Sequence, residues 1–243
     1  MSRSPRSARI RLVCWMAGGA AAAVLLVLSW PVTTRFGVNW EWSSKRLPMY
    51  EKAINFISRD LQTRRLASEV TGGASDDEAK LLRAFTWVTE HIRPTPEGFP
   101  IVDDHVWNIL VRGYGSPDQR AEAFAVLASY AGFPATATCL QTAGMQGGAC
   151  LTIVQFHGRQ AVFDAPHRIV FRNEHGALAS IEDLLRQPAL ITAAAKDHVP
   201  AHVPYEPHFV QLANVHLRFS RMENQKPWRR FANELLRLAR IVR

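Results

Sequence analysis

The sequence lacks internal repeats, long low-complexity stretches and the motifs of nucleic-acid-binding domains. Without such motifs, a formal net charge of +8 does not make nucleic acid the expected partner. Cysteine is scarce, with only Cys14, Cys139 and Cys150. Apolar residues make up 47% of the chain, so we expect a packed core and not a disordered protein.

Acidic residues are absent from the arginine-rich N-terminus, which carries Arg3, Arg6, Arg9 and Arg11. Residues 12–30 then form a charge-free apolar run that ends at a tryptophan, close to the roughly 20 residues that a membrane-spanning helix needs. The flanking arginines fit the positive-inside rule. No small-x-small cleavage site follows, so we expect an uncleaved single-pass anchor in the inner or cytoplasmic membrane, with the N-terminus cytoplasmic and the rest outside.

The chain is expected to have four parts. Residues 1–31 are the arginine-rich start and anchor, residues 32–46 a linker, residues 47–220 a globular domain, and residues 221–243 a basic amphipathic helix. The apolar face of that last helix either packs on the domain or, in the alternative, the helix contacts anionic headgroups or glycan.

Within the domain, the patterns predict helices followed by strands. Apolar spacing indicates helices over residues 48–70 and 75–91, and Ser116-Pro117-Asp118-Gln119 is a sharp start signal for a third helix. Strands are expected over residues 136–141, 151–156, 161–163 and 169–171, and a short helix after Ser180. Helices followed by an antiparallel meander indicate an α+β fold.

These elements, in this order, resemble the bacterial transglutaminase-like domains, which share the papain-like cysteine-peptidase architecture. The resemblance runs from about residue 76 to about residue 183. It rests on residues 87–94, 102–105, 112–115, 118–119, 131–135 and 158–164. It implies helices packed on an antiparallel sheet, and a subgroup that accompanies envelope or exopolysaccharide biosynthesis genes.

The resemblance also implies a Cys-His-Asp triad, of which two members are missing. The nucleophile position, directly before Asp118-Gln119, is Pro117. The histidine position, eight or nine residues before Gly158, is Cys150 or Ala149, and only the third member remains, as Asp164. Acyl transfer needs an activated thiolate and a base, so we expect no transglutaminase or cysteine-peptidase activity. Asp164 then becomes a relic or a structural hydrogen-bond acceptor.

Other candidate residues leave alternatives open. Cys139 and Cys150 lie on neighbouring predicted strands, so they form a disulfide, remain two buried thiols, or supply a relocated nucleophile with His157 or His167. Cys14 belongs to the anchor. The prolines among His198, His202 and His208 break helical ligand spacing, which favours an irregular surface loop over a metal site. We expect neither a metal nor a cofactor.

The sequence therefore predicts an inactive, membrane-anchored transglutaminase-like protein that binds an envelope glycan, a peptide or a protein of the polysaccharide machinery. One alternative is an active cysteine hydrolase or acyltransferase with a rearranged site. The other is a purely structural assembly protein.

Overall fold

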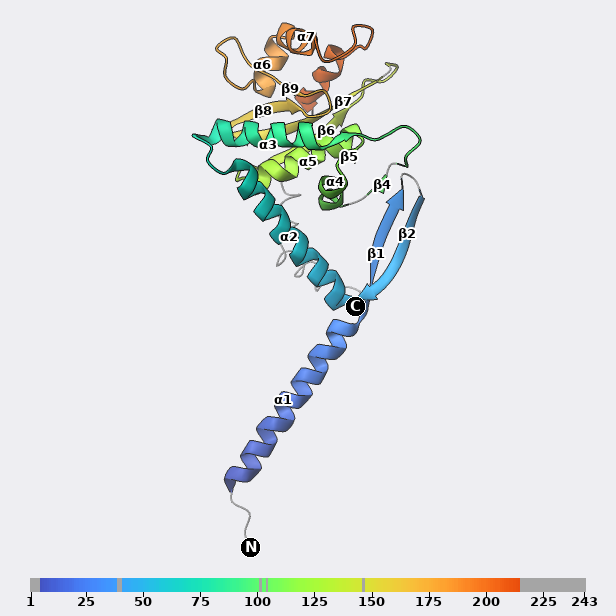
Figure 1. Ribbon diagram of the computed structural model, residues 1–243, viewed down its shortest axis with the longest axis vertical. Helices are drawn as coiled ribbons and strands as arrows, with labels where there is room; N and C mark the ends of the chain where they lie inside the picture. The colour runs from blue at the N-terminus through green and yellow to red at the C-terminus, as the bar shows by residue number, and fades with distance from the viewer. Residues whose placement is uncertain (1–4, 39–40, 101, 104, 146, 215–243) are drawn as a thin grey trace. The chain divides into compact units, whose positions relative to one another are not determined.

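The computed structural model describes residues 5–38, 41–100, 102–103, 105–145 and 147–214 (Figure 1). The chain divides into two compact units, Met1–Ser58 and Arg59–Arg243. The basic helix expected over residues 221–243 lies outside the described residues.

The first unit contains a long helix and a hairpin. Helix α1 (Pro5–Ser29) is followed by strands β1 (Pro31–Val38) and β2 (Glu41–Pro48), which pair antiparallel from Pro31↔Pro48 to Val38↔Glu41. The residues expected to be a linker, 32–46, lie within this hairpin. Each strand provides hydrogen-bond partners for the backbone groups of the other. This pairing depends on the partner strand, so the mixed local sequence of either segment does not reveal it.

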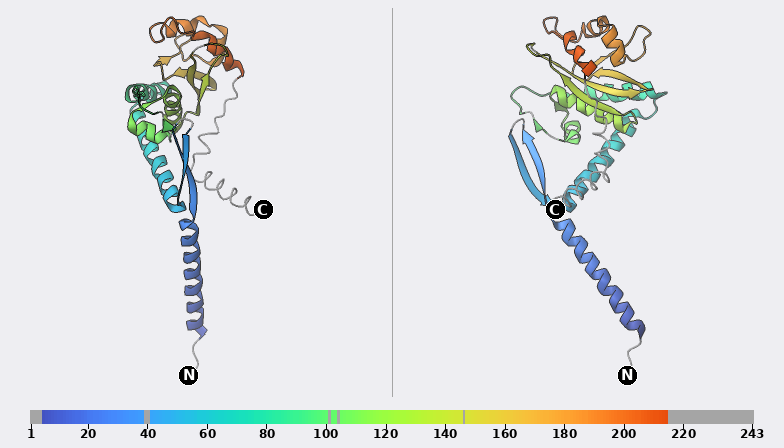
Figure 2. Two further views of the ribbon diagram at one scale, coloured as in Figure 1. Left: turned by 90° about the vertical axis from the view of Figure 1, so that its right-hand side faces the viewer. Right: turned by 180° about the vertical axis from the view of Figure 1, so that it is seen from behind.

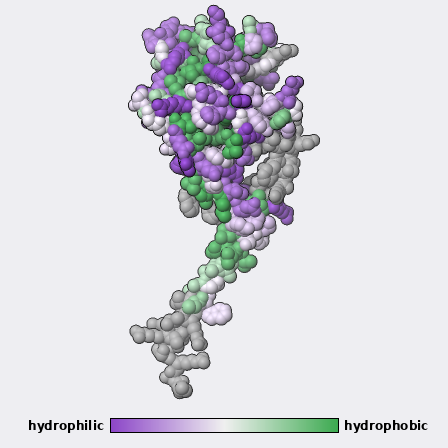
Figure 3. Space-filling model, viewed as in Figure 1, coloured by the Kyte–Doolittle hydropathy of each residue, from purple (hydrophilic) through white to green (hydrophobic). Residues whose placement is uncertain are grey.

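Helix α1 coincides with the expected anchor. Its exposed side chains include Trp15, Met16, Val24, Leu25 and Leu26, and hydrophobic residues gather over its end nearest the hairpin (Figure 3). Among the residues that the structure describes, no helix meets the length and apolarity needed to cross a membrane. The anchoring role of α1 stays a prediction.

The predicted helices are present. Helix α2 spans Met49–Thr71 and α3 spans Asp77–His91. The helix expected from residue 75 is capped by Asp76: the Ala79 N–H donates to Asp76 Oδ1 at 2.8 Å. Helix α5 (Pro117–Tyr130) begins after Ser116, and the Ser116 N–H donates to Gln119 Oε1 at 3.2 Å.

Short elements connect these helices. They are β3 (Arg93–Pro94), β4 (Val102–Asp103), α4 (Val106–Arg112) and β5 (Tyr114–Gly115). Strands β3 and β5 pair in parallel. Gly115 lies tightly under α5, because a Cβ atom there would lie 3.1 Å from Gln119 Cβ and 3.3 Å from Ile109 Cγ2. This packing places the start of α5.

The expected antiparallel meander is confirmed. Strands β6 (Ala135–Leu140), β7 (Ala149–Phe156), β8 (Arg159–Asp164) and β9 (Ile169–Val170) form one sheet in that order. Helices α6 (Ile181–Arg186) and α7 (Ala189–Ala195) and the 3-10 helix η1 (Glu206–Asn214) follow. The sequence predicted α6 but not α7 or η1.

Each face of this sheet is buried under a different set of helices (Figures 1 and 2). Phe163 packs with Phe85 of α3 and Phe124 of α5, with ring centroids 5.1–5.5 Å apart. On the other face, Ile153 and Val162 belong to a second core cluster formed with α6, α7 and η1. Neighbours along β8 thus point to opposite cores, as the period of a strand requires.

Cys139 and Cys150 lie directly opposite each other on β6 and β7, and their sulfur atoms are bonded in the structure. The Gln155 N–H donates to the Pro134 carbonyl, so these two residues are a hydrogen-bonded pair. Such pairs alternate along antiparallel strands, so the even-numbered residues of β6 form the hydrogen-bonded pairs with β7. Cys139↔Cys150 is therefore one of the closer, non-hydrogen-bonded pairs, with Cα atoms 4.0 Å apart. This register brings the two sulfur atoms together.

We expect this bridge to form in the mature protein. In a Cys14→Ser background, which removes the free thiol, alkylation without reduction should add no mass to the chain. Changing both Cys139 and Cys150 to Ser should lower the free energy of unfolding by about 2–3 kcal/mol, because a covalent loop restricts the unfolded chain. Alkylation of both thiols before reduction would contradict the prediction.

Candidate functional site

The nucleophile position of the resembled triad lies at the first turn of α5. Pro117 is exposed there as the first helical residue, and it has no nucleophilic atom. Ser116, next to it, is buried, and its hydroxyl takes part in the capping box of α5 and donates to the Asp118 carboxylate. Neither residue offers a thiolate at the positive end of the helix.

The strand position is equally unsuited to act as a base. Ala149 is fully buried, and Cys150 is bonded to Cys139. Both begin β7, whose Thr152 hydroxyl donates to the Ala121 carbonyl of α5 at 2.8 Å. The start of β7 and the first turns of α5 are therefore neighbours.

Asp164 ends β8 and is fully buried. Its Oδ1 accepts the His167 backbone N–H at 2.8 Å, and its Oδ2 lies 2.9 Å from His167 Nδ1. The hydroxyl of Tyr205 also donates to Oδ2. A buried carboxylate needs such partners, and here they come from the following turn and from the segment just before η1.

Arg120 joins α5 to this end of β8. It is 5% exposed, and its two terminal nitrogens donate to the carbonyls of Pro166 and Ala165 at 2.9 and 3.2 Å. Its Nε is buried without a hydrogen-bond partner. Arg120 therefore ties the first turn of α5 to the turn that follows Asp164.

Protonation of this cluster follows from its contacts. The hydrogen bond to Asp164 raises the pKa of His167, although burial and the charge of Arg120 oppose it. Burial and the Asp164 carboxylate raise the pKa of Tyr205, so its hydroxyl stays protonated. The His167 side chain is 29% exposed, so one side of the ring meets solvent.

The other candidate histidines do not join the cluster. His157 lies on the exposed β7–β8 turn, stacks on Phe156 and lies 3.8 Å from Asp77. His208 is fully buried, which corrects the expected surface loop: its Nδ1 accepts the Thr142 N–H at 3.2 Å. Over the described parts of the chain, no group of three or more His, Cys, Asp or Glu side chains could hold a metal ion.

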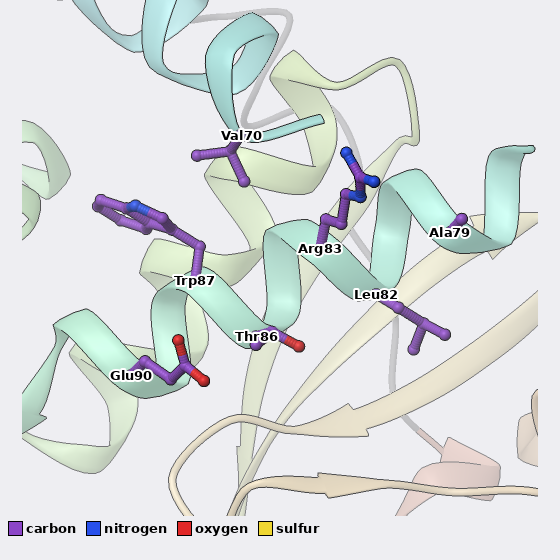
Figure 4. A pocket seen from close by; sticks show the side chains of 7 residues that line it. All are labelled: Val70, Ala79, Leu82, Arg83, Thr86, Trp87 and Glu90. Carbon is purple, nitrogen blue, oxygen red and sulfur yellow. The ribbon is translucent and has the colours of Figure 1, made fainter. Parts of the chain in front are cut away.

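A separate shallow groove, with a volume of about 480 Å³, lies along α3 (Figure 4). Its lining comes from the end of α2 and the outer side of α3: Val70, Ala79, Leu82, Arg83, Thr86, Trp87 and Glu90. It contains none of the degenerate triad positions.

Sequence reasoning missed Arg120 and Tyr205 and named His167 only as a possible partner of a relocated cysteine. The spacing of Asp164 and His167, three residues apart after a strand, was the available signal. Tyr205 gave none, because it reaches Asp164 across 41 residues of chain.

We expect stability to depend on His167 protonation. Because its folded pKa lies above the unfolded value, its contribution is full below about pH 6.5 and is lost as pH rises through the folded pKa. The difference in free energy of unfolding between wild type and His167→Gln should therefore be larger at about pH 6 than at about pH 9. NMR titration should show the imidazole midpoint falling in Asp164→Asn, and an unchanged midpoint would contradict the contact.

The chain was compared with known proteins. A model of the transglutaminase-like superfamily matches residues 64–155. No curated protein matched the chain. A structure described as a putative cysteine protease from Cytophaga hutchinsonii is 14% identical, over 52% of this chain and 45% of that one, with a TM-score of 0.40. A putative protease from Parabacteroides distasonis is 10% identical, over 55% and 35%, with a TM-score of 0.36.

The chain thus spans less than half the length of both solved structures, and similarity at this level says nothing about activity. The family match covers α3, α4, α5, β6 and most of β7, which are the elements that carry the first two triad positions. Residues 64–155 are thus similar to transglutaminase-like superfamily domains.

Proposed function

We propose that this chain is a catalytically inactive transglutaminase-like protein, held at the cytoplasmic membrane by α1 with its domain outside. There it binds a component of envelope or exopolysaccharide biosynthesis. The observation that carries the proposal is the exposed proline at the nucleophile position, Pro117.

Acyl transfer by this class of site needs a thiolate, a base and an acid that orients the base. A proline suits the first turn of a helix because the amide hydrogen that it lacks would have no helical partner. Pro117 thus improves the helix and removes the nucleophile. The histidine position, Ala149 or Cys150, supplies no base, because Ala149 is buried and Cys150 is bonded to Cys139.

Asp164, at the third position of the triad, has a structural role in this proposal. Asp164 accepts hydrogen bonds from its own turn and from Tyr205, so both of its oxygens are occupied. Such an acid supports the packing of residues 165–205 on the sheet even when no triad exists. This supports a binding protein built on the enzyme fold.

An active cysteine enzyme with a rearranged site is the alternative. It would need Cys139 or Cys150 as a thiolate, yet both are bonded to each other. Both also lie on strands, away from the helix N-terminus that lowers a thiol pKa. The geometry therefore favours the inactive protein.

The membrane part of the proposal rests on α1 and its flanks. Side chains from Cys14 to Val27 are exposed, and apart from glycine they are largely apolar. Four arginines precede them with no acid between. An exposed apolar helix of this kind is at its lowest free energy in lipid, and the arginines favour the cytoplasmic side.

Catalysis offers the sharpest test. Wild type should show no thiol-dependent turnover of peptide or amide substrates, and a thiol-directed electrophile should not label Cys139 or Cys150 faster than free cysteine. Turnover abolished by Cys139→Ala or Cys150→Ala would overturn the proposal.

Thiol labelling tests the alignment. In the Cys14→Ser background, Pro117→Cys should react with iodoacetamide faster at neutral pH than Ser68→Cys, because a helix N-terminus stabilises a thiolate and a helix C-terminus does not. Ser68 is the matched control, because it is exposed like Pro117 and lies on the last turn of α2. Equal rates would place Pro117 outside any activating site.

Topology is tested by fusion. A reporter active only outside the cytoplasm should be active after Arg243 and inactive when fused after Arg11, before the apolar run. Activity of only a cytoplasmic reporter at Arg243 would overturn the orientation.

A further inference from the structure

The turn that follows β8, residues 165–168, is held in an unusual conformation. Arg168 has φ +61°, in the left-handed region that residues other than glycine seldom adopt. Arg120 holds the turn from below through the Ala165 and Pro166 carbonyls, and Asp164 holds it through the His167 N–H. A strained turn that is fixed this firmly is a common feature of ligand sites.

This turn concentrates positive charge. His167 and Arg168 are consecutive, and Arg120 lies under them. Burial, and then the positive charge of Arg168, lower the pKa of Arg120, which places the two guanidinium groups within electrostatic reach. Asp164 is the acid that faces them, and its oxygens are already occupied by His167 and Tyr205.

The solvent-facing side chains of the turn belong to His167 and Arg168. Arg168 is exposed, and within the described residues its side chain makes no hydrogen bond or ion pair. His167 uses Nδ1 on Asp164 and is partly open to solvent. Asp118, the acid at the start of α5, accepts the Ser116 hydroxyl. Two guanidinium groups, Arg120 and Arg168, thus face the single buried acid Asp164, so the turn itself carries an excess of positive charge.

We propose that the turn formed by residues 165–168, beside the degenerate triad, binds an anionic group of a ligand, the carboxylate of an acidic glycan, through His167 and Arg168. This rests on the proposed function, because it names the ligand class of that same site. Arg120 positions the turn and does not touch the ligand. A guanidinium suits a carboxylate because its parallel N–H groups match both oxygens.

The histidine makes this binding depend on pH. Its Nδ1 carries the proton shared with Asp164, so the neutral ring presents Nε2 as a bare acceptor, which repels an anion. Only the imidazolium has an N–H at Nε2. The charged groups around the ring are Asp164, Arg120 and Arg168, and the Tyr205 ring packs against it in a T-shaped arrangement. Binding should therefore weaken as pH rises through the His167 pKa.

The test uses the full chain in zwitterionic nanodiscs at about 0.15 M salt. Calorimetry compares tetragalacturonate, its methyl-esterified neutral form and inorganic phosphate between about pH 5.5 and 8, a range over which the carboxylates stay ionised. Arg168→Gln should weaken tetragalacturonate binding at least about tenfold, the effect of losing a charge-assisted hydrogen bond. His167→Gln should weaken it at low pH and remove the pH dependence.

Arg65→Gln is the matched control, because it removes the same charge from an exposed residue of α2 that pairs with Glu69. The melting temperature of Arg168→Gln should stay near that of wild type, so loss of binding is not loss of folding. Equal weakening by Arg65→Gln, equal binding of the neutral ester, or no binding of either anion would overturn the inference.

Two further outcomes separate this inference from the proposed function. Binding of phosphate but not of tetragalacturonate, with the same dependence on Arg168, would overturn the glycan carboxylate as the ligand and leave the anion site standing. Thiol-dependent turnover together with selective tetragalacturonate binding would overturn the inactive protein and support the anion site.

Discussion

A buried carboxylate is the constraint on which the rest of this domain depends. Asp164 is out of contact with water, and an ionised acid in that place is very costly unless every oxygen finds a donor. The donors come from two places, the turn at His167 and the hydroxyl of Tyr205. A strand that ends at Asp164 therefore requires both a tight turn at His167 and packing of the segment around Tyr205 against the end of that strand. A fold that kept the acid and lost these donors would be less stable than one that replaced the acid with an apolar residue.

The two-sided sheet is the second constraint. Alternate residues of β7 and β8 point into two separate cores, so neither the α3–α5 layer nor the α6–η1 layer can be removed without exposing apolar side chains. Helix α5 contributes most to the first core and also carries Arg120 to the end of β8. The end of β8 at Asp164 is therefore held by the same helix that stabilises the first core.

Local signals predicted much of this fold. The proline, serine and glutamine at the start of α5 act within one turn, and the short, largely apolar runs of β7 and β8 on either side of a turn are visible over a few residues. What failed depends on distant partners. The hairpin of β1 and β2 exists because two mixed segments pair, and His208 is buried because Thr142, 66 residues away in the chain, supplies its donor. The candidate site divides in the same way, since Asp164 and His167 are neighbours in sequence whereas Tyr205 is not.

The covalent bond between β6 and β7 has one more consequence. The disulfide lies next to Leu140↔Ala149, the last residue pair of β6 and β7 before the glycine-rich loop that connects them. The loop approaches the strand closely there, because a Cβ on Gly148 would lie 2.8 Å from the Leu140 oxygen. The loop itself is largely exposed, as the parts of a chain that proteases cut first generally are. A single cut in this loop would leave the two halves of the domain covalently joined. A nicked copy would keep its register, both of its cores and the turn at His167, and only a reductant would break the remaining covalent link between the fragments.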